Sequence, residues 1–202
     1  MSAPDPAGRR DPANGPAVVL VGPMGVGKST VGELLAARLG TAFRDSDADI
    51  VAAQGRSIAE IFVDDGETHF RELEREAVRR ALAEHTGGVL ALGGGAILDA
   101  ATRAELTGLP VAYLSMEVGE AARRTGLNTA RPLLAVNPRQ QWKLLMEGRR
   151  HLYTEVARVS VATDDRTPEE VVDAVLDALE PASPAAEELR IPGTIPGKEN
   201  PV

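Results

Sequence analysis

Short apolar runs alternate with longer amphipathic stretches along most of the chain. Runs of aliphatic residues predict buried strands, because a strand covered on both faces carries apolar side chains at successive positions. The expected strands are residues 18–21, 89–92, 111–114 and 159–162, with a weaker one at 42–44. The stretches between them predict helices at 28–39, 47–54, 57–62, 67–84, 100–106, 118–124, 139–154 and 168–179.

Strands that alternate with helices are typical of an α/β fold, in which helices cover both faces of a parallel sheet. The helix at 168–179 has the clearest start, since Thr167 and Glu170 form a capping box and Pro168 occupies the first helical position. In such folds ligands bind beyond the carboxyl ends of the strands. The loops that follow the strands are therefore where chemistry is expected.

The length of 202 residues predicts one domain that is large enough to bury a core. Residues 1–16 and 181–202 are rich in proline, glycine and polar residues and offer almost nothing to bury, so both are predicted to be disordered tails. The folded domain is expected to span residues 17–180, and it contains no internal repeat.

Charge and composition exclude several function classes. A formal net charge of -8 gives no overall attraction to nucleic acid, and no run of lysines predicts a membrane-surface patch. The chain contains no cysteine, no stretch long enough to cross a bilayer and no apolar signal segment, so we expect a cytoplasmic protein. An anionic ligand would have to be held by a few locally placed arginines.

The sequence GPMGVGKS, residues 22–29, matches the phosphate-loop pattern G-x-x-x-x-G-K-[ST] at every fixed position. It lies between a predicted strand and a predicted helix, which is the context this motif requires. Its glycines let backbone N–H groups curl around a phosphate, Lys28 adds a positive charge, and Ser29 supplies a hydroxyl for a phosphate-bound Mg²⁺. A simple glycine-rich turn and a dinucleotide fingerprint are the alternatives, but the second lacks the G-x-G-x-x-G order.

Two aspartates follow the second predicted strand in the sequence RDSDADI. Asp45 and Asp47 are two residues apart, so only one of them can point along a given side of an extended segment. We assign Asp45 to the magnesium site and Asp47 to accepting a proton from a substrate hydroxyl. The alternative is that these aspartates only cap the following helix.

Further candidates for the site lie in later segments. Arg71 stands among acidic neighbours on a predicted helix, where a solvated or ion-paired arginine is the alternative. The three adjacent glycines at 93–95 follow the third strand, and they favour backbone amides that face a ligand over a flexible linker. Residues 122–138 carry three arginines and suit a mobile flap. Arg149 and Arg150 follow, and either can be surface charge.

The motifs GPMGVGKSTVG, DSDADI, GRSIAEIF, GETHFRELE, LGGGA, NTARPLL and RRHLY occur in the order seen in shikimate kinases. The resemblance covers approximately residues 17–180. It implies a three-layer α/β/α P-loop kinase fold, similar to nucleoside monophosphate kinases, with a five-stranded parallel sheet in the order 2-3-1-4-5. It also implies a lid at about 126–138 and a monomeric enzyme with ATP and shikimate as its small-molecule substrates.

The resemblance also implies roles for individual residues. Shikimate-binding positions are matched by Asp47, Arg71, Gly93, Gly94, Gly95 and Arg149, with Asp47 orienting or deprotonating the 3-hydroxyl. ATP-binding positions are matched by Gly25, Val26, Gly27, Lys28, Ser29, Thr30, Arg124 and Arg131. Among these, Lys28 and Arg131 match residues that stabilise the moving phosphoryl group, and Arg124 matches the side chain stacked on adenine. Ser29 and Asp45, the latter through water, match the surroundings of Mg²⁺.

The sequence thus predicts a shikimate kinase that transfers the γ-phosphoryl group of ATP to the 3-hydroxyl of shikimate. Two alternatives remain within P-loop kinases, namely a gluconate-type kinase and a nucleotide kinase. A third is a P-loop switch that hydrolyses nucleotide slowly, although the chain has no guanine-selecting N-K-x-D sequence.

Overall fold

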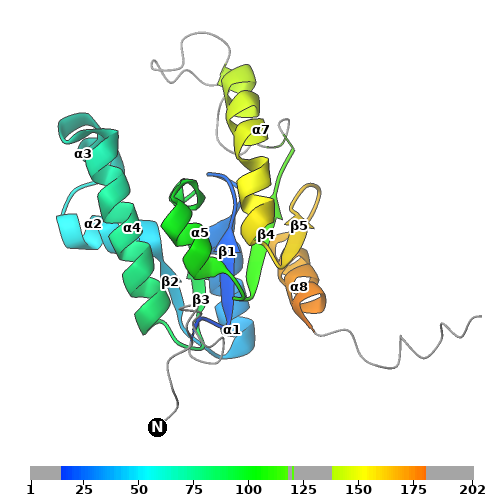
Figure 1. Ribbon diagram of the computed structural model, residues 1–202. Coiled ribbons are helices and arrows are strands. Elements are labelled where there is room, and N and C mark those ends of the chain that lie inside the picture. The colour runs from blue at the N-terminus through cyan, green and yellow to red at the C-terminus, as the bar shows by residue number, and fades with distance from the viewer. Residues whose placement is uncertain (1–14, 118–119, 121–137, 181–202) are drawn as a thin grey trace, which may run out of the picture.

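The computed structural model describes residues 15–117, 120 and 138–180 (Figure 1). Its centre is a five-stranded parallel sheet in the order β2-β3-β1-β4-β5, as predicted. The strands are β1 (Val18–Val21), β2 (Phe43–Asp45), β3 (Val89–Ala91), β4 (Val111–Ser115) and β5 (Val159–Ala162). Each lies within one residue of its predicted bounds, because the aliphatic runs coincide with the buried parts of the sheet.

The helices also follow the sequence pattern. They are α1 (Lys28–Leu39), α2 (Ser46–Gln54), α3 (Ile58–Asp64), α4 (Gly66–Glu84), α5 (Ala100–Leu106), α7 (Pro138–Val156) and α8 (Pro168–Leu179), with a 3₁₀ turn, η2 (Ala96–Leu98). The sequence did not predict η2, since three residues are too few to show a helical period. The helix predicted at 118–124 lies outside the described residues, apart from residue 120. None of the described helices has the combination of length and hydropathy that a bilayer span requires.

Two apolar cores sandwich the sheet, because successive side chains of a strand point to opposite faces. In β1, Val18 and Leu20 join the core beneath α1 and α8. Val19 and Val21 join the core on the other face, beneath α4, α5 and α7. Together, the sheet and the helices on its two faces form the three layers of an α/β/α fold.

A smaller core links α2, α3 and α4. Figure 1 shows these helices beyond β2, at one end of the sheet. Ile50, Ile61 and Phe70 fill this core, one from each helix. The start of α3 is fixed by a capping box between Ser57 and Glu60, which satisfies two N–H groups that would otherwise lack partners. The resulting three-helix unit holds α4 beside α2, which begins directly after β2.

The parallel sheet brings three predicted site segments together at the carboxyl ends of its strands. The strand register pairs Leu20 of β1 and Asp45 of β2 with the same residue of β3, Ala91. The phosphate loop, the two aspartates and the glycine loop therefore begin at nearly the same level. At the opposite side of the fold, where β1 and β3 begin, the Gly15 carbonyl accepts a hydrogen bond from the Gly87 N–H at 2.9 Å. The two tails remain predictions.

Candidate functional site

The phosphate loop has a backbone that glycine makes possible. Gly25 and Gly27 have φ angles of 82° and 98°, in the left-handed region that side-chain-bearing residues rarely adopt. Gly27 is also the N-cap of α1 and provides no side-chain cap. The first N–H groups of α1 are therefore left for another acceptor, and together with the helix dipole they favour an anion.

Lys28 folds back over this loop. Its Nζ donates to the carbonyl oxygens of Gly22 and Pro23 at 2.9 and 3.0 Å. Burial lowers the pKa of Lys28, while the negative charges of Asp47 and Asp45 oppose that shift. The ammonium group thus lies between the phosphate loop and the two aspartates, where a bound phosphate would give it an anionic partner.

Asp45 connects the phosphate loop to α2. Its Oδ2 accepts a hydrogen bond from Ser29 Oγ at 2.9 Å, and its Oδ1 accepts the Asp47 N–H at 2.9 Å. Asp45 therefore caps α2, as the alternative interpretation predicts, and its role at Mg²⁺ stays a prediction. The oxygen atoms of Ser29 and Asp45 are the donor type that Mg²⁺ prefers. Residues 15–117, 120 and 138–180 contain no group of three or more His, Asp or Glu side chains arranged to hold a metal ion.

Asp47 has a buried carboxylate oxygen, Oδ1, with no hydrogen-bond partner among the described residues. Burial raises the pKa of Asp47, the charge of Asp45 raises it further, and Lys28 and Arg71 oppose the shift. A buried acceptor without a donor costs about 1–3 kcal/mol. A ligand hydroxyl that donates to this oxygen would remove that cost, and a carboxylate with a raised pKa is suited to act as a base.

Arg71 is held in place by acidic and aromatic side chains. It donates to Glu74 at 2.6 Å and to Glu67 at 3.0 Å. Its guanidinium carbon lies 5.9 Å from the ring centre of Phe62 and 5.4 Å from that of Phe70. The ion-paired interpretation of Arg71 is therefore correct, and the same pairs fix its side chain at the edge of the site.

Glu74 was missed by the sequence analysis. Glu74 is only 4% exposed. Burial raises the pKa of its carboxyl group, while the hydrogen bond from Arg71 and the charge of Arg71 oppose the shift. Asp47 and Arg149 also affect this pKa, so both lie near the Glu74 carboxyl group. A buried acidic residue three positions after an arginine on one helix was the available signal, but burial is not visible in the sequence.

The glycine loop packs closely against the other parts of the site. A Cβ at Gly93 would overlap Oδ1 of Asp47, and a Cβ at Gly95 would overlap Nη1 of Arg71. A Cβ at Gly94 would lie 3.2 Å from the backbone nitrogen of Met24 in the phosphate loop. A side chain at Gly93 or Gly95 would force Asp47 or Arg71 to move, and the space at Gly94 is tight, so this packed loop does not fit the flexible-linker interpretation.

Helix α7 brings Arg149 to this loop. The hydroxyl of Tyr153, one turn further along α7, donates to the Gly94 carbonyl at 2.7 Å. Burial raises the pKa values of Tyr153 and Glu74, and the positive charge of nearby Arg149 opposes both shifts. The neighbouring Arg150 acts instead on the pKa of Tyr113. Arg149 and Arg71 thus approach the same buried carboxylate, that of Glu74, from α7 and α4.

The structure brings most of the predicted site residues together. The described part of the site contains Gly25, Val26, Gly27, Lys28, Ser29, Thr30, Asp45, Asp47, Arg71, Gly93, Gly94, Gly95 and Arg149. Arg124, Arg131 and the lid residues 126–137 lie outside the described residues, so their roles stay predictions. The sequence analysis also missed Ser46, which accepts the Gly93 N–H, and Tyr153, because both act through contacts with residues distant in the sequence.

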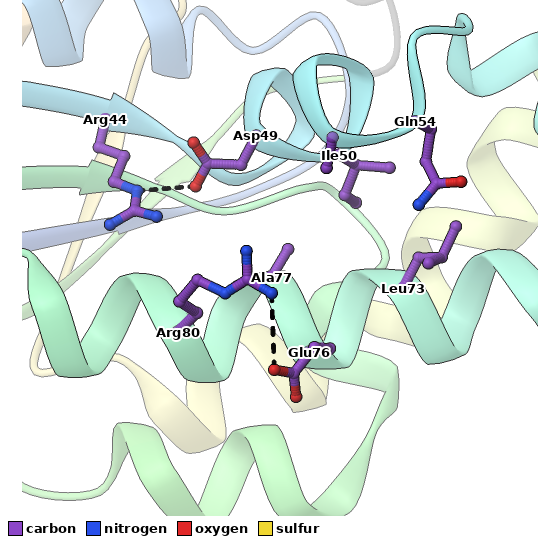
Figure 2. Close-up of a pocket in the computed structure, with 9 residues that line it drawn as sticks. Arg44, Asp49, Ile50, Gln54, Leu73, Glu76, Ala77 and Arg80 are labelled. Atoms are coloured by element: carbon purple, nitrogen blue, oxygen red, sulfur yellow. Dashed lines mark hydrogen bonds and ion pairs between the residues drawn. The ribbon is translucent and has the colours of Figure 1, made fainter.

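A separate pocket lies between α2 and α4 (Figure 2). The charged residues that line it are paired, with Arg44 donating to Asp49 at 2.7 Å and Arg80 lying 3.8 Å from Glu76. Its other lining residues are Ile50, Ala53, Gln54, Leu73 and Ala77. None of the predicted site residues lines this pocket.

Comparisons with known proteins point in one direction. A family model described as "Shikimate kinase" matches residues 24–180. A shikimate kinase of Streptomyces coelicolor is 74% identical over 165 residues, which cover 82% of this chain and 96% of that protein. One from Salinispora arenicola is 58% identical over 156 residues, covering 77% and 93%. A solved shikimate kinase from Acinetobacter baumannii, in complex with shikimate, has a TM-score of 0.74 and 36% identity, covering 86% of this chain and 94% of that one.

Proposed function

This chain belongs to the shikimate kinase family, and from that premise we propose how its residues carry out the reaction. It is an ATP-dependent small-molecule kinase that transfers the γ-phosphoryl group of ATP to the 3-hydroxyl of shikimate, giving ADP and shikimate 3-phosphate. The relatives reported above are named shikimate kinases, which favours this activity over that of a gluconate-type kinase. The product belongs to the biosynthesis of chorismate and the aromatic amino acids.

The unpaired oxygen of Asp47 is the observation that carries the proposed mechanism. Asp47 accepts a hydrogen bond from the 3-hydroxyl of shikimate, orients its oxygen toward the γ-phosphorus and takes its proton as the bond forms. Burial raises the pKa of Asp47, although the positive charges of Lys28 and Arg71 oppose this rise. The carboxylate is therefore a better proton acceptor than an exposed aspartate.

The phosphate side of the reaction is assigned to the loop and the first turn of α1. The backbone N–H groups around Gly25, Gly27 and Thr30 bind the phosphates of ATP, and the Lys28 ammonium follows the charge that develops on the transferred group. Ser29 and Asp45 would hold Mg²⁺, which when bound neutralises phosphate charge. We assign Arg131 to stabilising the charge on the transferred phosphoryl group and Arg124 to stacking on the adenine ring.

The carboxylate of shikimate is assigned to Arg71 and Arg149. Both guanidinium groups lie near Glu74, and a guanidinium pair is suited to a small carboxylate. The backbone N–H groups of the glycine loop, at Gly94 and Gly95, complete this side of the pocket. Glu74 keeps Arg71 oriented before the substrate arrives.

Closure of a lid at about 126–138 would exclude water, which otherwise competes with shikimate as the phosphoryl acceptor. The enzyme is proposed to act as a cytoplasmic monomer, with no nucleic-acid or membrane partner. Sedimentation with ATP and shikimate present tests the monomer directly, since a faster-sedimenting species would contradict it.

The activity is tested in an assay that couples ADP release to NADH oxidation. Shikimate, gluconate and nucleoside monophosphates are supplied separately. Turnover with shikimate alone is expected, whereas turnover with gluconate and none with shikimate contradicts the assignment. A crystal soaked with ADP and shikimate tests the residue roles, because the substrate carboxylate should lie between Arg71 and Arg149.

A further inference from the structure

Tyr153 is a buried residue of α7 that the reaction scheme does not yet use. It is 1% exposed, and its ring stacks on that of Tyr113 with 5.0 Å between the ring centres and 6° between the planes. Such packing is typical of a core tyrosine. Its hydroxyl, however, reaches the loop after β3 and donates to the Gly94 carbonyl at 2.7 Å. Tyr153 therefore joins α7 to the glycine loop.

This hydrogen bond fixes the orientation of one peptide unit. A trans peptide is planar, and its C=O and N–H point in opposite directions. The Gly94 carbonyl and the Gly95 N–H belong to the same unit. Because the carbonyl is held by Tyr153, the Gly95 N–H points away from Tyr153. Gly95 also lies against Arg71, since a Cβ there would overlap Nη1 of the guanidinium.

The rest of the loop is held by other contacts. The Gly93 N–H donates to Ser46 Oγ at 2.9 Å, and the Gly93 carbonyl accepts the Ala96 N–H at 3.1 Å. Three successive glycines would otherwise leave the backbone many conformations. The Gly94–Gly95 unit depends on α7, which also carries Arg149.

We propose that Tyr153 is a positioning residue for shikimate binding: its hydroxyl holds the Gly94–Gly95 peptide so that the Gly95 N–H and the Arg149 guanidinium meet the substrate together. This inference rests on the proposed function. Burial raises the pKa of Tyr153, although nearby Arg149 opposes the shift, so the phenol stays protonated at neutral pH and donates.

The variant Tyr153→Phe removes the hydroxyl and keeps the stacked ring. We expect its KM for shikimate to rise about tenfold, or about 1.4 kcal/mol, which is the size of one net hydrogen bond. Its kcat and its KM for ATP should stay within about twofold of wild type, because the phosphate loop is untouched. Tyr113→Phe is the matched control, since it removes a hydroxyl from the same ring pair and should leave all three constants unchanged.

Two results would overturn the proposal. They are an unchanged KM for shikimate in Tyr153→Phe, whether or not kcat falls, and an equal rise of that KM in Tyr113→Phe. Wild-type enzyme that does not phosphorylate shikimate is a separate failure, because it removes the proposed function before any variant is measured.

A second measurement uses only the wild-type protein, in case the variant does not fold. In ¹⁵N-labelled enzyme, saturating shikimate should shift the amide resonance of Gly95, because its N–H meets the substrate. Gly108 lies in a turn before β4 and serves as the reference. A Gly95 resonance that moves no more than that of Gly108 contradicts the proposal.

Discussion

Gly93 is the position where a single methyl group should disturb the chemistry most directly. A Cβ there would overlap Oδ1 of Asp47 and would lie 2.9 Å from Oε1 of Glu74. Gly93 is not among the glycines with positive φ, so its backbone accepts alanine. The substitution Gly93→Ala therefore acts through its Cβ alone, and the Asp47 carboxylate must move to make room.

The size of the effect follows from that overlap. Restoring an ordinary contact requires the Asp47 carboxylate to move by about 1 Å, and a misplacement of this size can cost about 100-fold in rate. This factor corresponds to about 2.7 kcal/mol of transition-state stabilisation. We expect kcat/KM for shikimate to fall by about 100-fold, while the KM for ATP changes less than about threefold.

The coupled ADP assay measures both constants. Gly148→Ala is the matched control, because nothing lies within 4 Å of a Cβ at that position, which is adjacent to Arg149 on α7. It should leave activity unchanged and stabilise the helix by roughly 1 kcal/mol. If folded Gly93→Ala retained kcat/KM within about twofold of wild type, the reasoning that Asp47 must keep this exact place would be refuted.

Three other substitutions, with Arg150→Ala as a control for the last, test the assigned roles. Lys28→Met should leave less than about 1% of the wild-type kcat with an unchanged circular dichroism spectrum, because the negative charge on the transferred phosphoryl group loses the ammonium that stabilises it. Substantial turnover would remove Lys28 from the mechanism. Asp47→Asn should lower kcat at least about 100-fold while calorimetry shows an unchanged Kd for ATP. The same variant should have a higher Tm at neutral pH, because a folded-state pKa above the unfolded value makes ionisation of Asp47 destabilising as pH rises. That difference in Tm should shrink as the pH falls from the raised folded-state pKa toward the unfolded value of about 3.9 and should be lost below it, and equal Tm values at pH 7 would contradict the burial argument. Arg149→Ala should raise the KM for shikimate about 10- to 100-fold and Arg150→Ala should not, whereas the reverse result would assign the carboxylate to Arg150.

The fold was largely predictable because its signals are local. Aliphatic runs mark strands that are buried on both faces, and the capping box of Thr167 and Glu170 is found in the structure as the sequence predicts. The phosphate loop is equally local, since its glycines, Lys28 and Ser29 lie within eight consecutive residues, 22–29. A pattern of this kind is readable without knowing what packs against it.

The different roles of Asp45 and Asp47 follow from the sequence and the tertiary structure together. The sequence placed Asp45 and Asp47 after one strand, but their different roles come from their surroundings. The two carboxylate oxygens of Asp45 accept hydrogen bonds from Ser29 Oγ and the Asp47 N–H, whereas Asp47 has one buried oxygen without a donor among the described residues. The sequence shows two similar carboxylates, and only the packing around them makes one a cap and the other a candidate base.

By itself, the sequence determined the order of the elements, the phosphate loop and the set of candidate side chains. Tertiary structure alone decided that Glu74 is buried against Arg71, that Gly93 leaves room for Asp47, and that Tyr153 holds Gly94. The physical reason is separation along the chain. Helix and strand periods arise from neighbouring residues, whereas burial, close approach and the orientation of a peptide depend on segments that only folding brings together.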